Sequence, residues 1–383
     1  MSSADDGQIG PARVLLNGWF WGQETTGSGQ YVQQLALQLP QVAPAAAWGL
    51  AAPRPLTAPP GWQVIVVAPP TWLRSENLAK LWFEQIGFPR ACRRWRATLA
   101  HVPYWAPPLC TPCPLVVTIH DLIPLRLPAY RGGPRQRLYT WLVSRSARRA
   151  RLLLTDSQAS RQDIIEHLHI PPTRVRVTYL APGADFRRIS DPARLAAVRA
   201  RYGLSPRFVL YMGGFDTRKN VGAVLAAFAQ ALPALPADVM LVIAGRLPAH
   251  NRAFAPDPRP LAAELGLAGR VIFTGWVDEA DKPALYSLAE VFVFPSLYEG
   301  FGLPVLEAMA HGCPVVCSNS SSLPEVGGDA ALYFDPNDAA AAALQCASVA
   351  QERARLTSAG LERAKQFTWA QHWTKLCDLY RSL

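Results

Sequence analysis

The sequence has 383 residues, half of them hydrophobic, and a formal net charge of +10. This chain is longer than an ordinary domain with one hydrophobic core, which predicts two domains. The seven cysteines are scattered, and Cys110 and Cys113 form a C-x-x-C without a second pair, so no structural zinc site is expected. No apolar run approaches the roughly 18 residues of a membrane-spanning helix, and the polar N-terminus is no secretory signal, which predicts a cytoplasmic protein.

In the first half of the chain, apolar runs at 12–18, 45–52 and 63–68 predict strands. An amphipathic helix follows the first run, and Gly27 precedes that helix, where α/β domains bind ligands. Strands and helices continue to alternate, which predicts an N-terminal doubly wound domain over residues 1–184.

His120 lies at the carboxyl end of the apolar run 115–124 and is followed by Asp121. A lone histidine near a strand end is usually structural. This one lies where ligands gather in doubly wound sheets, which favours a functional role.

Positive charge is concentrated in the first half of the chain. Residues 1–185 carry a formal charge of +9 and residues 186–383 only +1, and residues 90–151 contain 12 arginines with a single acid. This asymmetry predicts a partner of negative charge. The arginines form either a solvated helix face or a contact with an anionic membrane or acceptor, and we expect that patch at Arg145, Arg148 and Arg149.

Residues 185–206 are charged, contain prolines and lack a strand pattern, which predicts a linker. Four further strand runs then predict a second parallel-sheet domain over 207–367, followed by a helix at 368–383. These runs lie at 208–214, 239–246, 271–275 and 290–296.

Two loops of the second domain carry the candidate chemistry. After the run 290–296 comes Glu299, a turn with two glycines, and a helix with Glu307 in its first turn. Such a turn and helix start suit a bound anion. After the run 208–214, the pair Arg218-Lys219 would place cations beside a diphosphate.

The stretch YEGFGLPVLEAMAHGCPVV (298–316) resembles the E-x7-E signature of retaining GT-B glycosyltransferases, and its amino-acid sequence is similar to that of family 4. GGFDTRKN (213–220) resembles the family's phosphate segment, and VVTIHDL (116–122) its N-domain histidine segment. The resemblance spans nearly the whole chain. It implies two Rossmann-like doubly wound parallel-sheet domains with an interdomain cleft, an acceptor bound by the first domain, and a final helix that returns toward it.

The resemblance also implies a role for each matching residue. Glu307 would bind the donor ribose, Glu299 would lie by the transferred sugar, and Lys219 would meet the diphosphate. The expected catalytic residues are His120, Lys219 and Glu299. The expected donor-binding residues are Gly27, Gly213, Arg218, Lys219, Val277, Glu299, Gly300, Phe301, Gly302, Leu303 and Glu307.

No D-x-D pair occurs in the sequence, so we expect no metal and no cofactor, with a nucleotide sugar as substrate. Gly214 stands where some branches of family 4 carry an arginine, which favours the mannosyltransferase-like branch. The hypothesis is a retaining glycosyltransferase that moves a hexose, mannose from GDP-mannose, to a glycan or lipid-linked glycan in polysaccharide biosynthesis. We expect the protein to be peripheral at the inner membrane face.

Three alternatives stay open. A UDP-sugar donor is the nearest one, and a nucleotide-sugar epimerase of similar two-domain shape is another. A nucleic-acid-binding protein would also explain the charge of +10, but the sequence contains no recognisable nucleic-acid-reading module.

Overall fold

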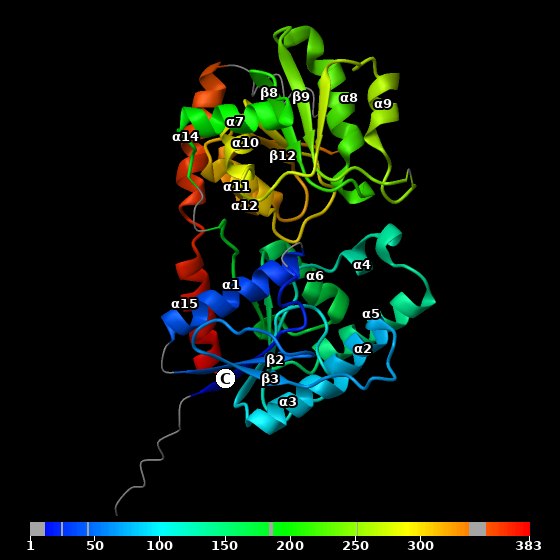
Figure 1. The fold of residues 1–383 in the computed structure, drawn as a ribbon, viewed down its shortest axis with the longest axis vertical. Coiled ribbons are helices and arrows are strands. Elements are labelled where there is room, and N and C mark those ends of the chain that lie inside the picture. The colour runs from blue at the N-terminus through cyan, green and yellow to red at the C-terminus, as the bar shows by residue number, and fades with distance from the viewer. Residues whose placement is uncertain (1–11, 24–25, 44–45, 184–186, 251, 337–349) are drawn as a thin grey trace, which may run out of the picture. The chain divides into compact units, whose positions relative to one another are not determined.

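We describe residues 12–23, 26–43, 46–183, 187–250, 252–336 and 350–383 of the chain in a computed structural model. The chain divides into two compact units (Figure 1). Unit 1 comprises the chain up to Thr178 together with Ala370–Leu383, and unit 2 comprises Tyr179–Trp369.

Unit 1 is built on a seven-stranded, all-parallel sheet in the order β3-β2-β1-β4-β5-β6-β7. The order runs in opposite directions from β1, so β1 and β4 form a topological switch point. The predicted doubly wound parallel sheet is confirmed. Its strands are β1 (Arg13–Asn17), β2 (Ala47–Ala52), β3 (Trp62–Val66), β4 (Leu99–Val102), β5 (Leu115–Thr118), β6 (Leu152–Thr155) and β7 (Val175–Val177).

Helices cover both faces of this sheet. On one face, Leu15 of β1 belongs to a buried cluster with side chains of the helical segments that follow β3, β5 and β6. On the other face, the indole of Trp62 donates a hydrogen bond of 2.6 Å to the carbonyl of Ala36 in α1. The helical segments are α1 (Gly27–Val42), α2 (Glu76–Trp82), η1 (Phe83–Gly87), α3 (Phe88–Trp95), α4 (Ile123–Arg126), η2 (Pro128–Tyr130), α5 (Pro134–Ala147), α6 (Gln158–Leu168) and η3 (Pro172–Arg174).

The last helix, α15 (Trp369–Arg381), packs on unit 1. The Tyr380 hydroxyl lies 2.5 Å from Nδ1 of His101 in β4, and His372 Nε2 lies 3.2 Å from the Tyr31 hydroxyl in α1. Burial, aided by the neighbouring histidines, lowers the pKa of His101 to about 3, so this histidine is neutral. One buried and one partly buried polar contact therefore fix α15 to residues far away in the sequence.

Unit 2 repeats the architecture with a six-stranded, all-parallel sheet in the order β10-β9-β8-β11-β12-β13. Its switch point lies between β8 and β11, whose carboxyl ends are therefore neighbours. The strands are β8 (Arg207–Met212), β9 (Val239–Ala244), β10 (Val271–Gly275), β11 (Val291–Phe294), β12 (Val315–Ser318) and β13 (Ala331–Phe334).

Helices also cover both faces of the second sheet. Phe228 of α8 and Ala262 of α9 share one buried cluster with strand residues, and Tyr286 of α10 packs edge-on against Phe292 of β11 at 5.3 Å between ring centroids. Within the stretch 185–206, residues Pro192–Tyr202 form α7, whose Tyr202 hydroxyl donates to Asp281 at 2.9 Å. The other helical segments are η4 (Thr217–Lys219), α8 (Val221–Ala231), η5 (Leu232–Ala234), α9 (Pro258–Glu264), α10 (Lys282–Leu288), α11 (Leu303–Ala310), α12 (Leu323–Gly327), η6 (Gly328–Ala330) and α14 (Ala350–Ala364).

Across the described ranges of both units, no helix is long enough and apolar enough to cross a membrane.

Candidate active site

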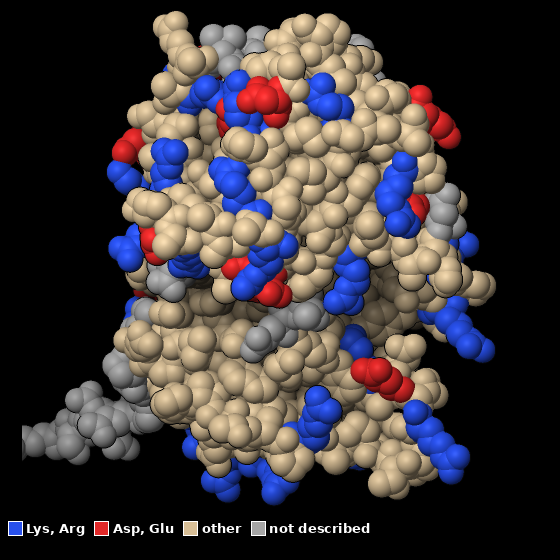
Figure 2. All heavy atoms as spheres, turned by 45° about the horizontal axis from the view of Figure 1, so that its top comes forward, with Lys and Arg blue, Asp and Glu red and all other residues tan. Residues whose placement is uncertain are grey.

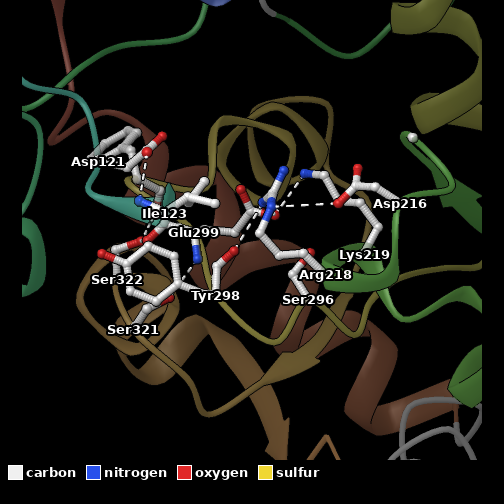
Figure 3. Close-up of polar contacts among 12 residues, drawn as sticks. Asp121, Ile123, Asp216, Arg218, Lys219, Ser296, Tyr298, Glu299, Ser321 and Ser322 are labelled. Atoms are coloured by element: carbon white, nitrogen blue, oxygen red, sulfur yellow. Dashed lines mark hydrogen bonds and ion pairs between the residues drawn. The ribbon is translucent and has the colours of Figure 1, made fainter. Parts of the chain in front are cut away.

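Glu299 in unit 2 is held by two cations from the loop after β8 (Figure 3). Its Oε1 accepts hydrogen bonds from Lys219 Nζ at 2.6 Å and lies 2.8 Å from Arg218 Nη1. Burial by itself would raise the pKa of Glu299, but the charges of Lys219 and Arg218 outweigh it and hold this pKa below its ordinary value. The carboxylate is therefore ionised at neutral pH.

The pairing of β8 with β11 explains why these residues meet although 80 positions separate them. The carbonyl of Arg218 accepts a hydrogen bond of 2.8 Å from the Leu297 amide, and Arg218 Nη1 donates one of 2.9 Å to the Tyr298 carbonyl. The Arg218 Nε also lies 3.6 Å from Asp216. Arg218 thus ties the two loops together, whereas Lys219 contributes its ammonium group to the site.

A run of serines after β12 supports the Glu299 loop (Figure 3). The Glu299 amide donates to Ser321 Oγ at 2.8 Å, and Ser322 Oγ donates to the carbonyls of Glu299 and Phe301 at 3.0 and 2.7 Å. Ser321 has a left-handed backbone, with φ of 50°. Sequence reasoning missed these serines; the signal available to it was three consecutive serines just beyond an apolar run.

The glycine turn leads directly into α11. Gly302 has φ of 105°, and a Cβ there would come within 2.6 Å of Leu323, so only glycine fits. The backbone of Gly300, Phe301 and Gly302 reaches the start of α11 at Leu303. The first amides of a helix lack partners within it, and together with the helix dipole they favour an anion at this point.

Glu307 lies in the second turn of α11, so the prediction of a first-turn position is wrong. The helix begins one residue before Pro304, which moves Glu307 further from the helix start. Its Oε2 accepts a hydrogen bond of 3.0 Å from the Tyr286 hydroxyl. Burial raises the pKa of Glu307 above its ordinary value, although nearby Lys282 and the bond from Tyr286 oppose that effect.

Two other predicted donor-binding residues lie at the same carboxyl edge of the second sheet. Gly213 follows β8, and a Cβ there would approach the Tyr211 hydroxyl to 2.9 Å. Val277 is buried just beyond β10. Beside it, half of Trp276 is exposed, and the guanidinium of Arg246 lies 5.2 Å from the centre of its ring.

His120 lies in unit 1, after β5, with Nδ1 2.6 Å from Asp156 Oδ2. Burial would lower the pKa of His120, but the charge and hydrogen bond of Asp156 raise it above the ordinary value. Its Nε2 is buried and has no hydrogen-bond partner among the described residues. Asp156 was missed in the sequence, where the signal was an acid two residues after the apolar run 152–154.

Gly27, also in unit 1, is the first residue of α1. A Cβ on Gly27 would meet no atom within 4 Å, whereas a Cβ on Gly29 would come within 2.1 Å of the Gln23 carbonyl oxygen. Packing therefore requires glycine at Gly29 and leaves open space beside Gly27.

The three arginines predicted as a patch are all exposed but contact different parts of unit 1. Arg145 lies over the ring of Trp141 at 6.0 Å, and Arg149 donates to the Leu109 carbonyl at 3.2 Å. Arg148 instead donates to the Leu168 carbonyl of α6 at 2.9 Å.

Within the described part of the chain, one group of three side chains has the spacing of metal ligands: Asp163, Glu166 and His167 on α6. Arg126 lies 3.5 Å from Asp163 and 3.4 Å from His167, so a cation already neighbours the group. None of these residues belongs to the candidate donor site.

Two family models match successive parts of the chain. The first, Glycosyltransferase Family 4, matches residues 25–181. The second, Glycosyl transferases group 1, matches residues 199–368.

Several curated proteins are similar in sequence. O-antigen chain mannosyltransferase B of Escherichia coli is 38% identical over 277 residues, which are 70% of each chain. The lipopolysaccharide core biosynthesis mannosyltransferase LpsB of Rhizobium meliloti (strain 1021) is 28% identical over 81% of this chain and 85% of its own. The serotype-specific mannosyltransferase WbdA of Escherichia coli is 36% identical over 59% of this chain, but the match spans only 28% of that longer protein.

Solved structures support the fold. Sucrose-phosphate synthase from Thermosynechococcus elongatus has a TM-score of 0.73 at 22% identity, covering 97% of this chain and 98% of its own. Anabaena HepE in complex with UDP has a TM-score of 0.72 at 18% identity, covering 97% of this chain and all of its own.

Proposed function

The chain belongs to family 4 of the GT-B glycosyltransferases, and on that premise we propose that it transfers mannose from GDP-mannose to a hydroxyl of a glycan or lipid-linked glycan, with retention of anomeric configuration. Polysaccharide biosynthesis is the process in which its curated relatives act, by their names. Mannose as the transferred sugar rests on those names as well. The names specify neither the donor nucleotide nor the stereochemistry, and we propose both.

One observation carries the proposal. Glu299, Lys219 and the start of α11 all lie in the loops that follow β8 and β11, where the strand order of the second sheet reverses. In open α/β sheets, ligands bind at this point. A diphosphate placed here would meet the Lys219 ammonium and helix-start amides. Negative charge on the diphosphate grows as the glycosidic bond breaks, so these groups would stabilise the transition state more than the bound donor.

Lys219 and Arg218 also explain how this charge can be neutralised without a metal. Both cations pair with Glu299, whose single negative charge offsets only one of them. An arriving diphosphate would share them, and the Glu299 carboxylate would keep lone pairs for the hydroxyls of the sugar. The departing nucleoside diphosphate would then leave next to fixed positive charge.

Glu307 would hold the ribose. Its Oε2 already accepts from Tyr286, which fixes the carboxyl group in one orientation. The other oxygen keeps acceptor capacity for a ribose hydroxyl.

In unit 1, His120 would act on a sugar hydroxyl. Its Nδ1 is committed to Asp156, which leaves Nε2 as the nitrogen available to substrate. Retention without a nucleophile on the opposite face of the sugar is explained by same-face attack, in which a donor phosphate oxygen takes the proton of the acceptor hydroxyl.

The test is a panel of nucleotide sugars. Binding is measured by calorimetry for GDP-mannose, UDP-glucose and UDP-N-acetylglucosamine, and turnover is then followed with mannosyl lipid acceptors. We expect GDP-mannose to bind most tightly and to give an α-mannoside, identified by NMR. The Lys219→Ala variant serves as the control, because it should lose turnover with the same donor.

Two outcomes would contradict the proposal. Binding of UDP-sugars without binding of GDP-mannose would refute the donor assignment. A changed sugar nucleotide formed without any acceptor would indicate an epimerase.

A further inference from the structure

An apolar groove of about 340 Å³ crosses the surface of unit 1 between α2, η1 and α5. Leu81, Trp82 and Leu142 are among its lining side chains, and Gln85 is its one polar lining residue. The helices α2 and α5 that border it are labelled in Figure 1.

Large apolar side chains are exposed around this groove. The described part of the chain exposes eleven such side chains, and Leu78, Ile86 and Leu109 among them line the groove. Leu138 and Trp141, 66% and 58% exposed, precede the lining residue Leu142 by four residues and one residue on α5. Exposed apolar groups gathered in this way mark an interaction surface.

Arginines flank the same groove. The guanidinium of Arg90 lies 5.6 Å from the ring centre of Trp82, that of Arg145 lies 6.0 Å from the ring centre of Trp141, and Arg149 donates to the Leu109 carbonyl. Each arginine therefore contacts a residue of the groove or of its exposed border. We call the groove, these apolar residues and the three arginines the docking surface.

Acidic side chains do not balance these arginines. From Glu76 to Arg151 the sequence has three acids, Glu76, Glu84 and Asp121, against twelve arginines, and Glu76 is the exposed first residue of α2. Glu84 is fully buried and paired with Lys80, so it presents no charge to solvent. On the face of the molecule drawn in Figure 2, Lys and Arg side chains are more widespread than Asp and Glu side chains, so positive charge is not confined to the docking surface.

We propose that the docking surface binds the interfacial region of an anionic lipid bilayer. Leu78, Leu138 and Trp141 would enter the boundary between headgroups and acyl chains, and the arginines would meet lipid phosphates. The arginines complement the negative charge of such a bilayer, and the exposed leucines and tryptophan complement its apolar interior. This inference does not depend on which nucleotide sugar the protein uses.

The arginines of the docking surface differ by one residue from the patch expected from the sequence. Arg148 donates its hydrogen bond to the Leu168 carbonyl of α6, which is not a residue of the groove. Arg90, which the sequence did not single out, takes its place. Arg148 and its neighbour Arg149 therefore form a matched pair, since replacing either removes one positive charge from an exposed position.

The experiment is co-sedimentation with vesicles of phosphatidylcholine alone or with phosphatidylglycerol. We expect binding only to the anionic vesicles, weakened by high salt. Arg149→Gln should weaken binding roughly fivefold and the Arg90, Arg145 and Arg149 triple glutamine variant roughly 100-fold. Arg148→Gln should bind like the wild type. Leu138→Ser with Trp141→Ser should weaken binding without lowering Tm, because both side chains are exposed.

Several results would overturn the proposal. These are equal binding to both vesicle types, no binding, equal effects of Arg148→Gln and Arg149→Gln, or displacement by free glycerol phosphate at matched phosphate concentration. A dimer in sedimentation analysis that Trp141→Ser dissociates would assign the surface to a second copy of the chain. Donor binding measured on the same variants should stay at the wild-type level, so failure here is distinguishable from failure of the proposed function.

Discussion

Replacing Glu307 with alanine should weaken donor binding and destabilise unit 2, by amounts that can be measured separately. The donor would lose a charge-assisted hydrogen bond to ribose, worth about 1.5–3 kcal/mol. That loss raises the Kd for GDP-mannose roughly 10- to 150-fold. Calorimetric titration of the folded variant measures it, and a Kd equal to that of the wild type would refute the ribose assignment.

The stability effect comes from Tyr286. Its hydroxyl is buried and donates to Glu307 at 3.0 Å, so alanine leaves this donor unsatisfied at a cost of about 1–3 kcal/mol. Glu307→Gln keeps an acceptor for Tyr286 and should unfold near the wild-type denaturant midpoint. Adding Tyr286→Phe to the alanine variant should recover stability but not donor affinity. If the double variant is no more stable than Glu307→Ala, the hydrogen bond to Tyr286 is not the cause.

Four further outcomes are expected. Lys219→Ala should lower kcat by about 10²- to 10³-fold with a smaller change in donor Kd, and equal losses in both would contradict transition-state stabilisation by its ammonium group. EDTA should leave activity intact; a loss that Mg²⁺ restores would refute metal independence. The folded-state pKa of Glu299 lies below its ordinary value of 4.5. The ionised carboxylate therefore stabilises the fold above pH 4.5, and this stabilisation is lost as the pH falls through the folded-state pKa. The difference in unfolding free energy between wild type and Glu299→Gln should therefore shrink as the pH falls below 4.5, and a constant difference would count against the ion pair. Asp156 raises the pKa of His120, so Asp156→Asn should move the His120 limb of the kcat/KM profile to lower pH, and an unshifted profile would contradict that coupling.

Most strands were predictable because short apolar runs between turn residues have few other ways to be buried. Among the strands that the sequence analysis did not name is β4, Leu99–Val102. Its centre holds His101, a polar residue that looks unsuited to a buried strand. The partners that make its burial possible are Thr118 at 2.9 Å and Tyr380, which lies 279 residues further along the chain.

The location of the candidate site was predictable, but its contacts were not. The resemblance to family 4 implied that Lys219 and Glu299 both lie by the donor, and the pairing of β8 with β11 explains why the loops that carry them approach each other. That their side chains pair directly depends on the backbone path of both loops, which local sequence does not specify. The same reason applies to Ser321, Ser322 and Asp156, whose partners Glu299 and His120 lie in loops that follow other strands.

The place of α15 has a consequence for how the chain folds during synthesis. Unit 1 begins before unit 2 in the sequence, but its residues Ala370–Leu383 are translated only after all of Tyr179–Trp369. Unit 2 can therefore fold while unit 1 still lacks the helix that covers Tyr31 and His101. At about 5–20 residues per second, the ribosome needs roughly 10–40 s to make the intervening segment, and during that time an incomplete apolar face stays open to chaperones.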